Sequence, residues 1–177
     1  TNIAVIKYWG KRDERLHLPL NSSLSATLDS SNLRTETTVL ASRSFEKTRL
    51  WLNGKEQVVD AEHLESATRF QRCLREMMAR AAEHVSHLNN KGEIVNVAKS
   101  EWSSYKFHVI SINTFPTAAG LASSASGYAC LVYALGQLFG VKEAFEGEVT
   151  CIARQGSGSA CRSLMGGFVR WEKGTSP

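Results

Sequence analysis

The sequence is poor in proline and cysteine and lacks any long apolar run. It has three prolines and four cysteines in 177 residues. No two cysteines have the C-x-x-C spacing typical of zinc and redox sites. No apolar stretch approaches the roughly 20 residues that a membrane-spanning helix needs, and the first residues become charged too early for a secretory signal. We therefore expect a soluble, cytoplasmic protein with reduced, mostly buried thiols and no membrane partner.

Metal-ligating residues are too scattered to predict a protein-built metal site. The nearest pair of histidines, His84 and His87, has i,i+3 spacing on a predicted helix. A zinc site needs four ligands in close array, and no cysteine lies near this pair in the sequence. We therefore expect no zinc centre.

The chain is basic, and its basic residues are dispersed along the sequence. Its net charge is +4 and its isoelectric point is near 9.0. This balance favours an anionic partner, which could be a nucleic acid, a membrane surface or a phosphorylated small molecule. The basic residues form no run of five or six, which argues against a nucleic-acid-binding tail.

The pattern of apolar residues predicts an α+β fold. Hydrophobic residues make up 42% of the chain, enough for a core without disulfides. The dipeptide Asn53-Gly54 tolerates positive φ at both central positions of a turn, so it predicts a hairpin. Strands are predicted at 3–8, 24–28, 33–40, 106–113 and 167–171.

Helical spacing of apolar residues predicts a long helix over 61–88. Its stripe consists of Phe70, Leu74, Met77, Met78, Ala81, Val85 and Leu88. The polar, aperiodic stretch 89–104 is predicted to be a loop. Further helices are predicted at 124–139, 146–154 and 160–164.

A glycine followed by small residues precedes the second predicted helix. After Gly120, the free N–H groups of a helix start would converge on one point, and such a point binds phosphate. The hydroxyls of Ser123 and Ser124 could donate to a phosphate or reach a magnesium ion. The segment lacks the Walker pattern. A serine-capped helix with a small packing face would explain the same residues.

Two further segments carry residues suited to anions. Lys7 and Lys11 flank an aromatic pair at a strand end, where they could neutralise phosphate or carboxylate, or simply be solvated. Gly156 and Gly158 expose backbone amides in a glycine-serine turn. Arg162 lies one helical turn beyond this segment, and its fork suits a carboxylate, although a surface arginine would look the same.

These motifs together resemble a known family. The word Pro116-x-x-x-Gly120-Leu121-x-Ser123-Ser124-Ala125 resembles the phosphate loop of the GHMP small-molecule kinases. With N-I-A-V-I-K-Y-W-G-K-R-D, N-S-S-L-S and G-S-G-S-A-C-R-S in the same order, the chain is similar to diphosphomevalonate decarboxylases from its start to about Trp171. It departs at Ser126, where many members carry alanine, and the stretch 83–103 matches poorly and is predicted to be a variable loop.

The resemblance implies the fold and the reaction. The whole chain, 1–177, would be a GHMP-kinase N-terminal domain, a ribosomal-protein-like two-layer sandwich of mixed sheet and helices, without the C-terminal GHMP domain. Family members use ATP and Mg²⁺ to convert (R)-5-diphosphomevalonate into isopentenyl diphosphate, ADP, phosphate and CO2 in the mevalonate pathway. A homodimer is expected at full length, and no nucleic-acid partner.

The resemblance also implies a role for individual residues. The substrate contacts would be Asn2, Tyr8, Trp9, Gly10, Lys11, Arg69, Ser157, Gly158, Ser159, Ala160, Cys161 and Arg162. The ATP contacts would be Pro116, Gly120, Leu121, Ala122, Ser123 and Ser124, with Ser124 also reaching the metal. Lys7 and Arg162 would be catalytic. The family's catalytic aspartate belongs to the C-terminal half, so no general base is assigned.

Two rival functions stay open. A GHMP kinase could stop after phosphoryl transfer, but the segments around Lys7 and Arg162 favour the decarboxylase. An RNA-binding module of related fold would also be basic, but the chain lacks the aromatic and basic signature of RNA-recognition motifs.

Overall fold

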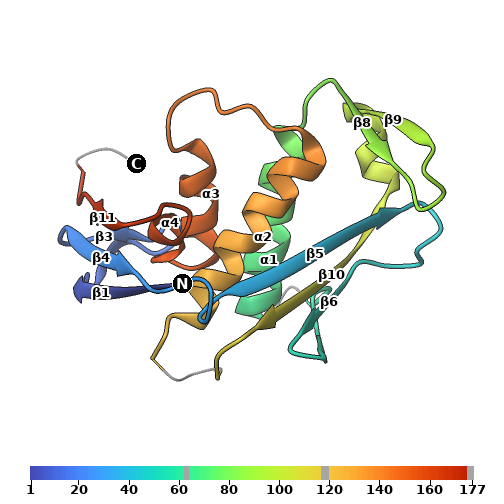
Figure 1. The fold of residues 1–177 in the computed structure, drawn as a ribbon. Coiled ribbons are helices and arrows are strands. Elements are labelled where there is room, and N and C mark those ends of the chain that lie inside the picture. Colours follow the sequence, from blue (N-terminus) through green and yellow to red (C-terminus); the bar gives the residue numbers. More distant parts are fainter. Residues whose placement is uncertain (62–63, 117–119, 175–177) are drawn as a thin grey trace.

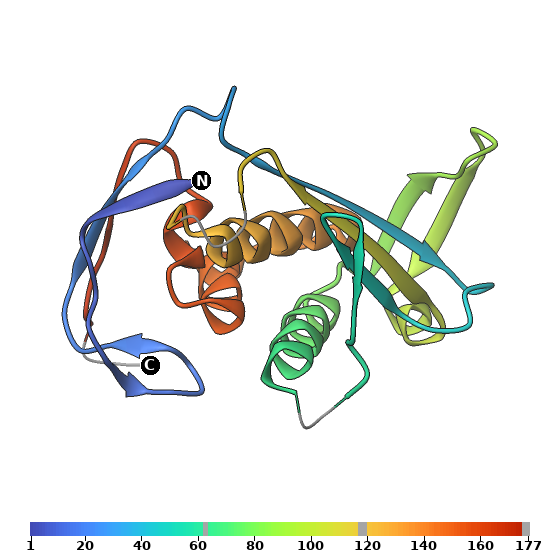
Figure 2. The same cartoon turned by 90° about the horizontal axis from the view of Figure 1, so that it is seen from below.

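Two sheets stand on either side of a group of helices (Figures 1 and 2). The structure, a computed structural model, describes residues 1–61, 64–116 and 120–174. The smaller sheet is antiparallel and has the order β1-β4-β11, with strands Asn2–Ile6, Ser23–Thr27 and Phe168–Trp171. The larger sheet has the order β5-β10-β6-β7, with strands Thr35–Ser42, Lys106–Asn113, Arg49–Leu52 and Lys55–Gln57. It is mixed, because β10 and β6 are parallel.

The helices form the middle of the molecule and complete the predicted α+β class. They are α1 (Glu65–Ala79), α2 (Ser123–Phe139), α3 (Glu148–Gly156) and α4 (Ala160–Ser163). Strand β10 alternates, so that Phe107 and Val109 face these helices and are buried. Val132, Leu135 and Phe139 of α2 are fully buried in the same core. Each such side chain contributes about 1.5–3 kcal/mol through burial.

The structure corrects the prediction for residues 80–104. Helix α1 ends at Ala79, and 84–88 is a strand, β8 (His84–Leu88), paired with β9 (Ile94–Ala98). A 3₁₀ helix, η1 (Lys99–Ser104), follows, so the predicted loop over 89–104 was also wrong.

The misassigned ribbon has a physical explanation. Val85 and Leu88 are three residues apart, which fits the apolar stripe of a helix. In β8 they lie on opposite faces, and the half-buried Val85 and His87 alternate with exposed neighbours. Gly92 provides the left-handed turn, with φ 77°. The ribbon is anchored by His87 Nε2, 2.7 Å from the carbonyl oxygen of Leu138, and the nearby Trp102 of η1 is buried.

The other predicted elements are confirmed within a few residues. Asn53 and Gly54 have φ of 48° and 78° and join β6 to β7 in the predicted hairpin. A small ribbon of β2 (Lys11–Asp13) and β3 (Leu18–Pro19) was not predicted.

The four thiols are all free. Cys73 is fully buried, and burial raises its pKa to about 12, whereas the other three cysteines are half-buried. Within the described ranges, no helix is long and apolar enough to cross a membrane. No group of three or more histidine, cysteine or acidic side chains that could hold a metal is found in the same part of the chain.

A charge network fastens the start of α3 to the end of α1. Arg80 donates to Glu148 at 2.6 Å and to Glu76 at 2.7 Å. The backbone N–H of Ala144 donates to the other oxygen of Glu148. This N–H and the Arg80 guanidinium lower the pKa of the Glu148 carboxyl.

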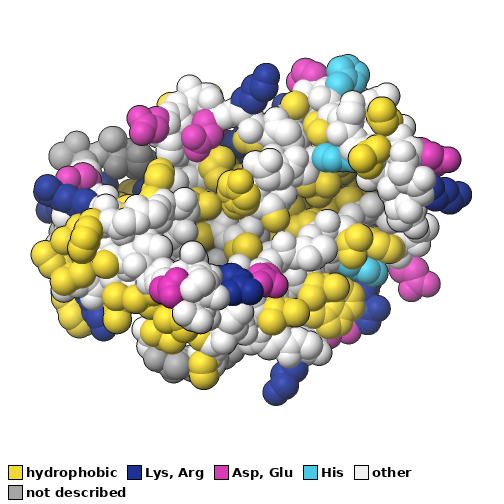
Figure 3. Space-filling model, viewed as in Figure 1, with side chains coloured by type: hydrophobic (Ala, Val, Ile, Leu, Met, Phe, Trp, Pro, Cys, Tyr) yellow, Lys and Arg dark blue, Asp and Glu magenta, His cyan; other side chains and the backbone are white. Residues whose placement is uncertain are grey.

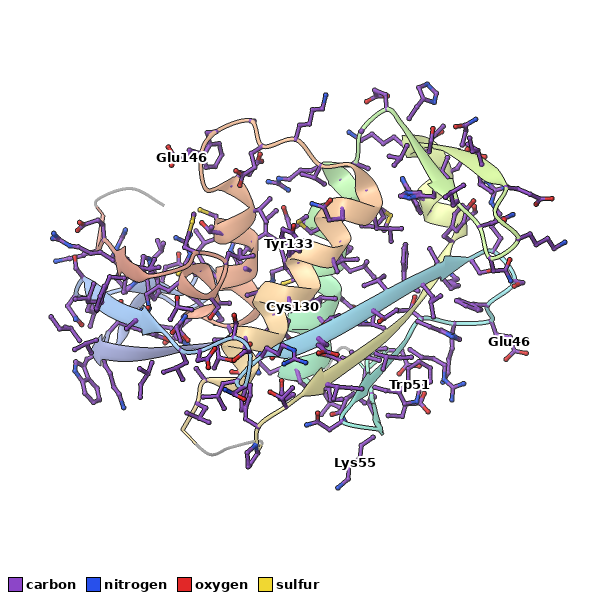
Figure 4. All side chains as sticks on the ribbon, in the orientation of Figure 1. Glu46, Trp51, Lys55, Cys130, Tyr133 and Glu146 are labelled. Carbon is purple, nitrogen blue, oxygen red and sulfur yellow. The ribbon has the colours of Figure 1, made fainter. Side chains whose placement is uncertain are left out.

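We expect Glu148→Gln to lower the melting temperature at pH 7. The folded pKa lies below the unfolded value of about 4.3, so the carboxylate stabilises the protein above that pH, and its contribution disappears as the pH falls through the folded pKa. The deficit of the variant should therefore shrink in acid. Glu146→Gln is the control, because Glu146 lies just before α3 and is exposed (Figure 4). A deficit that is constant from pH 7 to pH 3 would contradict the assignment.

Candidate active site

Helix α2 begins without a side-chain cap on its first backbone N–H groups. Gly120 and Ala122 both have left-handed backbone, with φ of 77° and 53°, and they turn the chain directly into the helix. No acidic residue occupies the first turn. Ser124 is exposed and Ser123 half-buried at this end. The start of α2 is therefore open to an anion. Of the other predicted contacts, Pro116 is exposed and Leu121 half-buried, and residues 117–119 of the same motif lie outside the described part.

A cavity of about 520 Å³ leads to this helix end. Its walls come from β5, β6, β7, β10, α1 and α2, and most of the large side chains are apolar: Leu50, Leu52, Val58, Val59, Phe70, Val109, Tyr128 and Leu131. Ser123 and Ser124 also line it. Its volume is typical of a small-molecule site. Sequence reasoning missed this cavity, although apolar pairs on both sides of the predicted hairpin were a usable signal.

Arg69 stands between the cavity and the glycine-serine turn. Its side chain lines the cavity, and its NH1 donates to the carbonyl oxygen of Gly156 at 3.3 Å. Its Nε is buried without a hydrogen-bond acceptor among the described residues, and the exposed Glu65 carboxylate lies 3.7 Å away. The guanidinium therefore retains capacity for an anion at this boundary.

Two glycines allow the turn to approach its neighbours closely. A Cβ on Gly156 would lie 2.1 Å from the ring of Tyr128, and one on Gly158 would lie 2.5 Å from the Tyr8 hydroxyl. The hydroxyls of Ser124 and Ser157 are 3.2 Å apart. The start of α2 and the glycine-serine turn are thus in direct contact.

Arg162 is a buried cation without an ionic partner. Its side chain is only 3% exposed. Its Nε donates to Ser25 at 3.1 Å, its NH1 donates to Ser23, and its guanidinium lies 5.7 Å from the centre of the Trp171 ring. No acidic side chain in the described ranges forms an ion pair with it, and burial lowers its pKa. Buried charges are normally paired, so this arrangement is suited to an anion.

Tyr8 lies near Trp171, the same ring that the Arg162 guanidinium approaches. Its ring meets Trp171 edge-on, with centroids 4.9 Å apart, and its hydroxyl borders Gly158. The sequence predicted Tyr8, Gly158 and Arg162 as neighbours through the resemblance alone. It assigned no role to Trp171 or to the two serines that hold Arg162. For the two serines a signal was present, because β4 begins within the word N-S-S-L-S and its buried positions, Ser23 and Ser25, are polar.

Several of the residues predicted to contact the substrate form hydrogen bonds within this chain or are buried in its core. The Asn2 amide donates to the Ser163 hydroxyl at 2.8 Å, which ties β1 to α4. Ala160 is fully buried in the core. Cys161 donates to the Gly158 carbonyl oxygen at 3.3 Å, and burial raises its pKa to about 12. Ser159, which is half-buried, accepts the backbone N–H of Arg162 at 3.1 Å through its carbonyl oxygen.

The segment after β1 lies on a separate depression. Asn21 fixes it by accepting the N–H of Trp9 at 2.8 Å and donating to the carbonyl oxygen of Lys7 at 3.1 Å. Lys7 and Trp9 line this depression, and Trp9 is 72% exposed. Gly10 turns the chain with φ 68°, and Lys11 pairs with Glu14 at 2.8 Å. No contact between Lys7 and Arg162 is recorded in the described part, so their joint catalytic role stays a prediction.

Comparison with known proteins gives a consistent result. The family model for the diphosphomevalonate decarboxylase-like N-terminal domain matches residues 1–177. The diphosphomevalonate decarboxylase of Danio rerio is 56% identical over 173 residues, which are 98% of this chain and 38% of that protein.

Solved structures of similar proteins agree with these sequence matches. Mevalonate diphosphate decarboxylase from Trypanosoma brucei is 40% identical with a TM-score of 0.78, over 99% of this chain and 40% of that one. The complex of MDDEF with MVAPP, AMPPCP and magnesium is 37% identical with a TM-score of 0.70, over 99% of this chain and 45% of that one. The chain thus spans about two-fifths of the length of its relatives.

We expect Gly156→Ala to destabilise the chain, because the added methyl group would overlap the Tyr128 ring. Overpacking of this kind costs about 1–3 kcal/mol. Urea denaturation would measure the free energy of unfolding. Gly166→Ala is the matched control, since a Cβ there meets nothing within 4 Å and its backbone is not left-handed. If both variants were as stable as the parent, the close approach of turn and helix would be wrong.

Proposed function

The chain belongs to the diphosphomevalonate decarboxylase family as its N-terminal domain, and on this basis we propose that it provides the nucleotide site and the carboxylate site of that enzyme. The reaction is the ATP-dependent conversion of (R)-5-diphosphomevalonate into isopentenyl diphosphate, with ADP, phosphate and CO2 as the other products. Because the chain covers two-fifths of its relatives, the complete reaction belongs to the longer protein.

The buried guanidinium of Arg162 is the observation that carries this proposal. It is held by two serine hydroxyls and an indole face, which are neutral, and it has no carboxylate of its own in the described residues. A substrate carboxylate would supply the missing charge through two parallel hydrogen bonds. The same group leaves as CO2 in the reaction.

The cavity fits a nucleotide. Its apolar walls would accept the base, and its end at Ser123 and Ser124 presents the start of α2 to the phosphates. The relative solved with MVAPP, AMPPCP and magnesium supports this assignment of ligand classes. Arg69, between cavity and turn, would then face phosphate groups from the nucleotide or from the substrate.

The donors for magnesium in this chain are few. Ser124 would supply a hydroxyl, and the described residues contain no acidic cluster to complete a cage. Mg²⁺ usually keeps several waters and binds substrate phosphates with one or two protein ligands, so this meagre donor set fits the ion. When bound, it would neutralise phosphate charge during transfer.

The residues of this chain would act mainly by positioning and by fixed charge. Arg162 would hold the carboxylate, while Lys7 and Lys11 would neutralise the diphosphate and the region of the reacting hydroxyl. Phosphorylation makes the tertiary hydroxyl a good leaving group, and its loss leaves positive character at that carbon, which loss of CO2 then quenches. The general base would come from the C-terminal part of the longer chain. We expect the longer chain to form a homodimer in the cytoplasm. We expect it to have no nucleic-acid or membrane partner.

The direct test is to supply the full-length protein with ATP, magnesium and (R)-5-diphosphomevalonate carrying a labelled carboxyl group. We expect equal amounts of ADP and labelled CO2. Release of ADP with a stable phosphorylated product and no CO2 would identify a kinase instead.

We expect Arg162→Gln in the full-length protein to abolish most decarboxylation and to leave nucleotide affinity almost unchanged. Loss of a charge-assisted pair in a closed site costs on the order of 2–5 kcal/mol. Arg170→Gln, a change at an exposed arginine on β11, is the control. Steady-state CO2 release would measure the effect on decarboxylation, and nucleotide titration would measure the effect on affinity. If the Arg162 variant turned over as fast as the parent protein, the assignment of Arg162 to the carboxylate would be wrong.

Ser124→Ala should impair the use of ATP more than the binding of diphosphomevalonate. The backbone donors of α2 remain in the variant, so affinity should fall only partly. Turnover should fall more, because charge moves onto the phosphoryl oxygens during transfer. Ser126→Ala is the control on the same helix, since that hydroxyl is buried against Thr35 at 2.7 Å. A rise confined to the KM for diphosphomevalonate would assign the helix end to the other ligand.

A further inference from the structure

One buried histidine joins the small β2–β3 ribbon to the end of α3. Among the histidines in the described ranges, His17 alone is buried, with 5% of its surface exposed. On the face shown in Figure 3, histidine side chains are visible only at the right-hand side, away from the end where β3 lies in Figure 1. The Nδ1 atom of His17 lies 2.8 Å from the carbonyl oxygen of Arg154. Because a carbonyl oxygen only accepts, Nδ1 carries the proton and donates this hydrogen bond.

The contact between these two residues is reciprocal. Arg154 lies in the last turn of α3, and its Nε donates to the carbonyl oxygen of Leu16 at 2.9 Å. Two hydrogen bonds in opposite directions therefore join residues 16–17 to the end of α3; we call this pair the His17–Arg154 contact. Arg72 of α1 supports the same turn, because its NH1 donates to the carbonyl oxygen of Arg15 at 3.0 Å. The turn before β3 is thus fixed to two helices.

The backbone of His17 is left-handed, with φ 52°. This conformation is uncommon for a residue with a side chain and persists only where the surrounding contacts hold it. Hydrophobic packing alone would be served by an apolar side chain in ordinary backbone. The combination of burial, left-handed backbone and one directed hydrogen bond therefore indicates a position at which geometry matters.

The His17–Arg154 contact lies between two segments that are predicted to hold the substrate. On one side, β2 begins at Lys11, the last residue of the segment 7–11. On the other side, Arg154 directly precedes the glycine-serine turn. A Cβ on Gly158 would lie 3.8 Å from the Cβ of His17 and 2.5 Å from the Tyr8 hydroxyl. His17 therefore borders this turn as well as fixing the helix that leads into it.

We propose that His17 is a positioning residue for the substrate, because it fixes the glycine-serine turn relative to the segment 7–11. The inference rests on the proposed function, which places diphosphomevalonate between these two segments. His17 is not among the residues that line the cavity assigned to the nucleotide. Loss of the His17–Arg154 contact should therefore impair the use of diphosphomevalonate and spare nucleotide binding.

Two substitutions in the full-length protein separate the hydrogen bond from the backbone conformation. His17→Gly permits left-handed backbone but removes the donor. His17→Asn also tolerates this conformation, and its Nδ2 is a donor at the place of the imidazole Nδ1. We expect His17→Gly to raise the KM for diphosphomevalonate by roughly tenfold or more, since small misplacements of positioning groups have effects of this size. The Kd of the nucleotide should stay almost unchanged, and His17→Asn should resemble the parent protein.

His84→Gly is the matched control, because His84 is exposed on the β8–β9 ribbon. It should keep the parental KM for both substrates. If His17→Gly does not fold, Arg154→Met removes the reciprocal hydrogen bond from the other side and should give the same rise in KM.

Hydrogen exchange of backbone amides tests the contact without the reaction. We expect residues 156–160 to exchange faster in His17→Gly than in the parent protein, while the start of α2 exchanges as before. Unchanged exchange in 156–160 would overturn the proposal. Lack of diphosphomevalonate turnover in the parent protein, together with faster exchange in the variant, would reject the proposed function and leave the His17–Arg154 contact established.

The kinetic results can overturn the proposal in three ways. A folded His17→Gly variant could keep the parental KM for diphosphomevalonate. It could also lose nucleotide and diphosphomevalonate binding to the same extent, which would indicate a general effect on stability. Finally, His17→Asn could be as impaired as His17→Gly, which would show that the donated hydrogen bond is not the cause.

Discussion

The burial of one guanidinium dominates the arrangement of this domain. The Arg162 side chain reaches from α4 to the β1-β4-β11 sheet, and the side-chain partners of its guanidinium in the described chain are two hydroxyls and an aromatic face. A buried cation costs free energy unless an anion completes it. The Ser23 and Ser25 hydroxyls at inward positions of β4 reduce that cost by accepting hydrogen bonds from the guanidinium. The polar inward positions of β4 and the anion site are therefore two consequences of one constraint.

The rest of the candidate site follows from close packing around this centre. Two glycines allow the turn to contact Tyr128 and Tyr8, which brings Ser157 next to Ser124 at the start of α2. A nucleotide phosphate and a substrate carboxylate would thus lie along one wall, with Arg69 between them. This proximity suits a reaction in which phosphoryl transfer and loss of CO2 occur on the same small molecule.

The sequence predicted the elements with strong local signals and missed those set by tertiary contacts. The Asn53-Gly54 turn and the start of α2 carry their own backbone chemistry, so both were correct. The helix predicted over β8 was wrong because Val85 and Leu88 keep the i,i+3 spacing of the helical stripe, whereas tertiary packing, with His87 against Trp102, selects a strand. The cavity walls come from β5, β6, β7, α1, β10 and α2, which no motif joins. The resemblance supplied Arg162, but only the structure showed its burial and the serines that hold it.

The central claim is that Arg162 recognises a carboxylate. Calorimetric titration of the full-length protein with (R)-5-diphosphomevalonate and with isopentenyl diphosphate, which lacks the carboxylate, compares the two ligands directly. The account predicts that the parent protein prefers the carboxylate ligand and that Arg162→Gln removes most of this preference while binding isopentenyl diphosphate almost as before. An Arg162→Gln variant that keeps the full preference of the parent would contradict it.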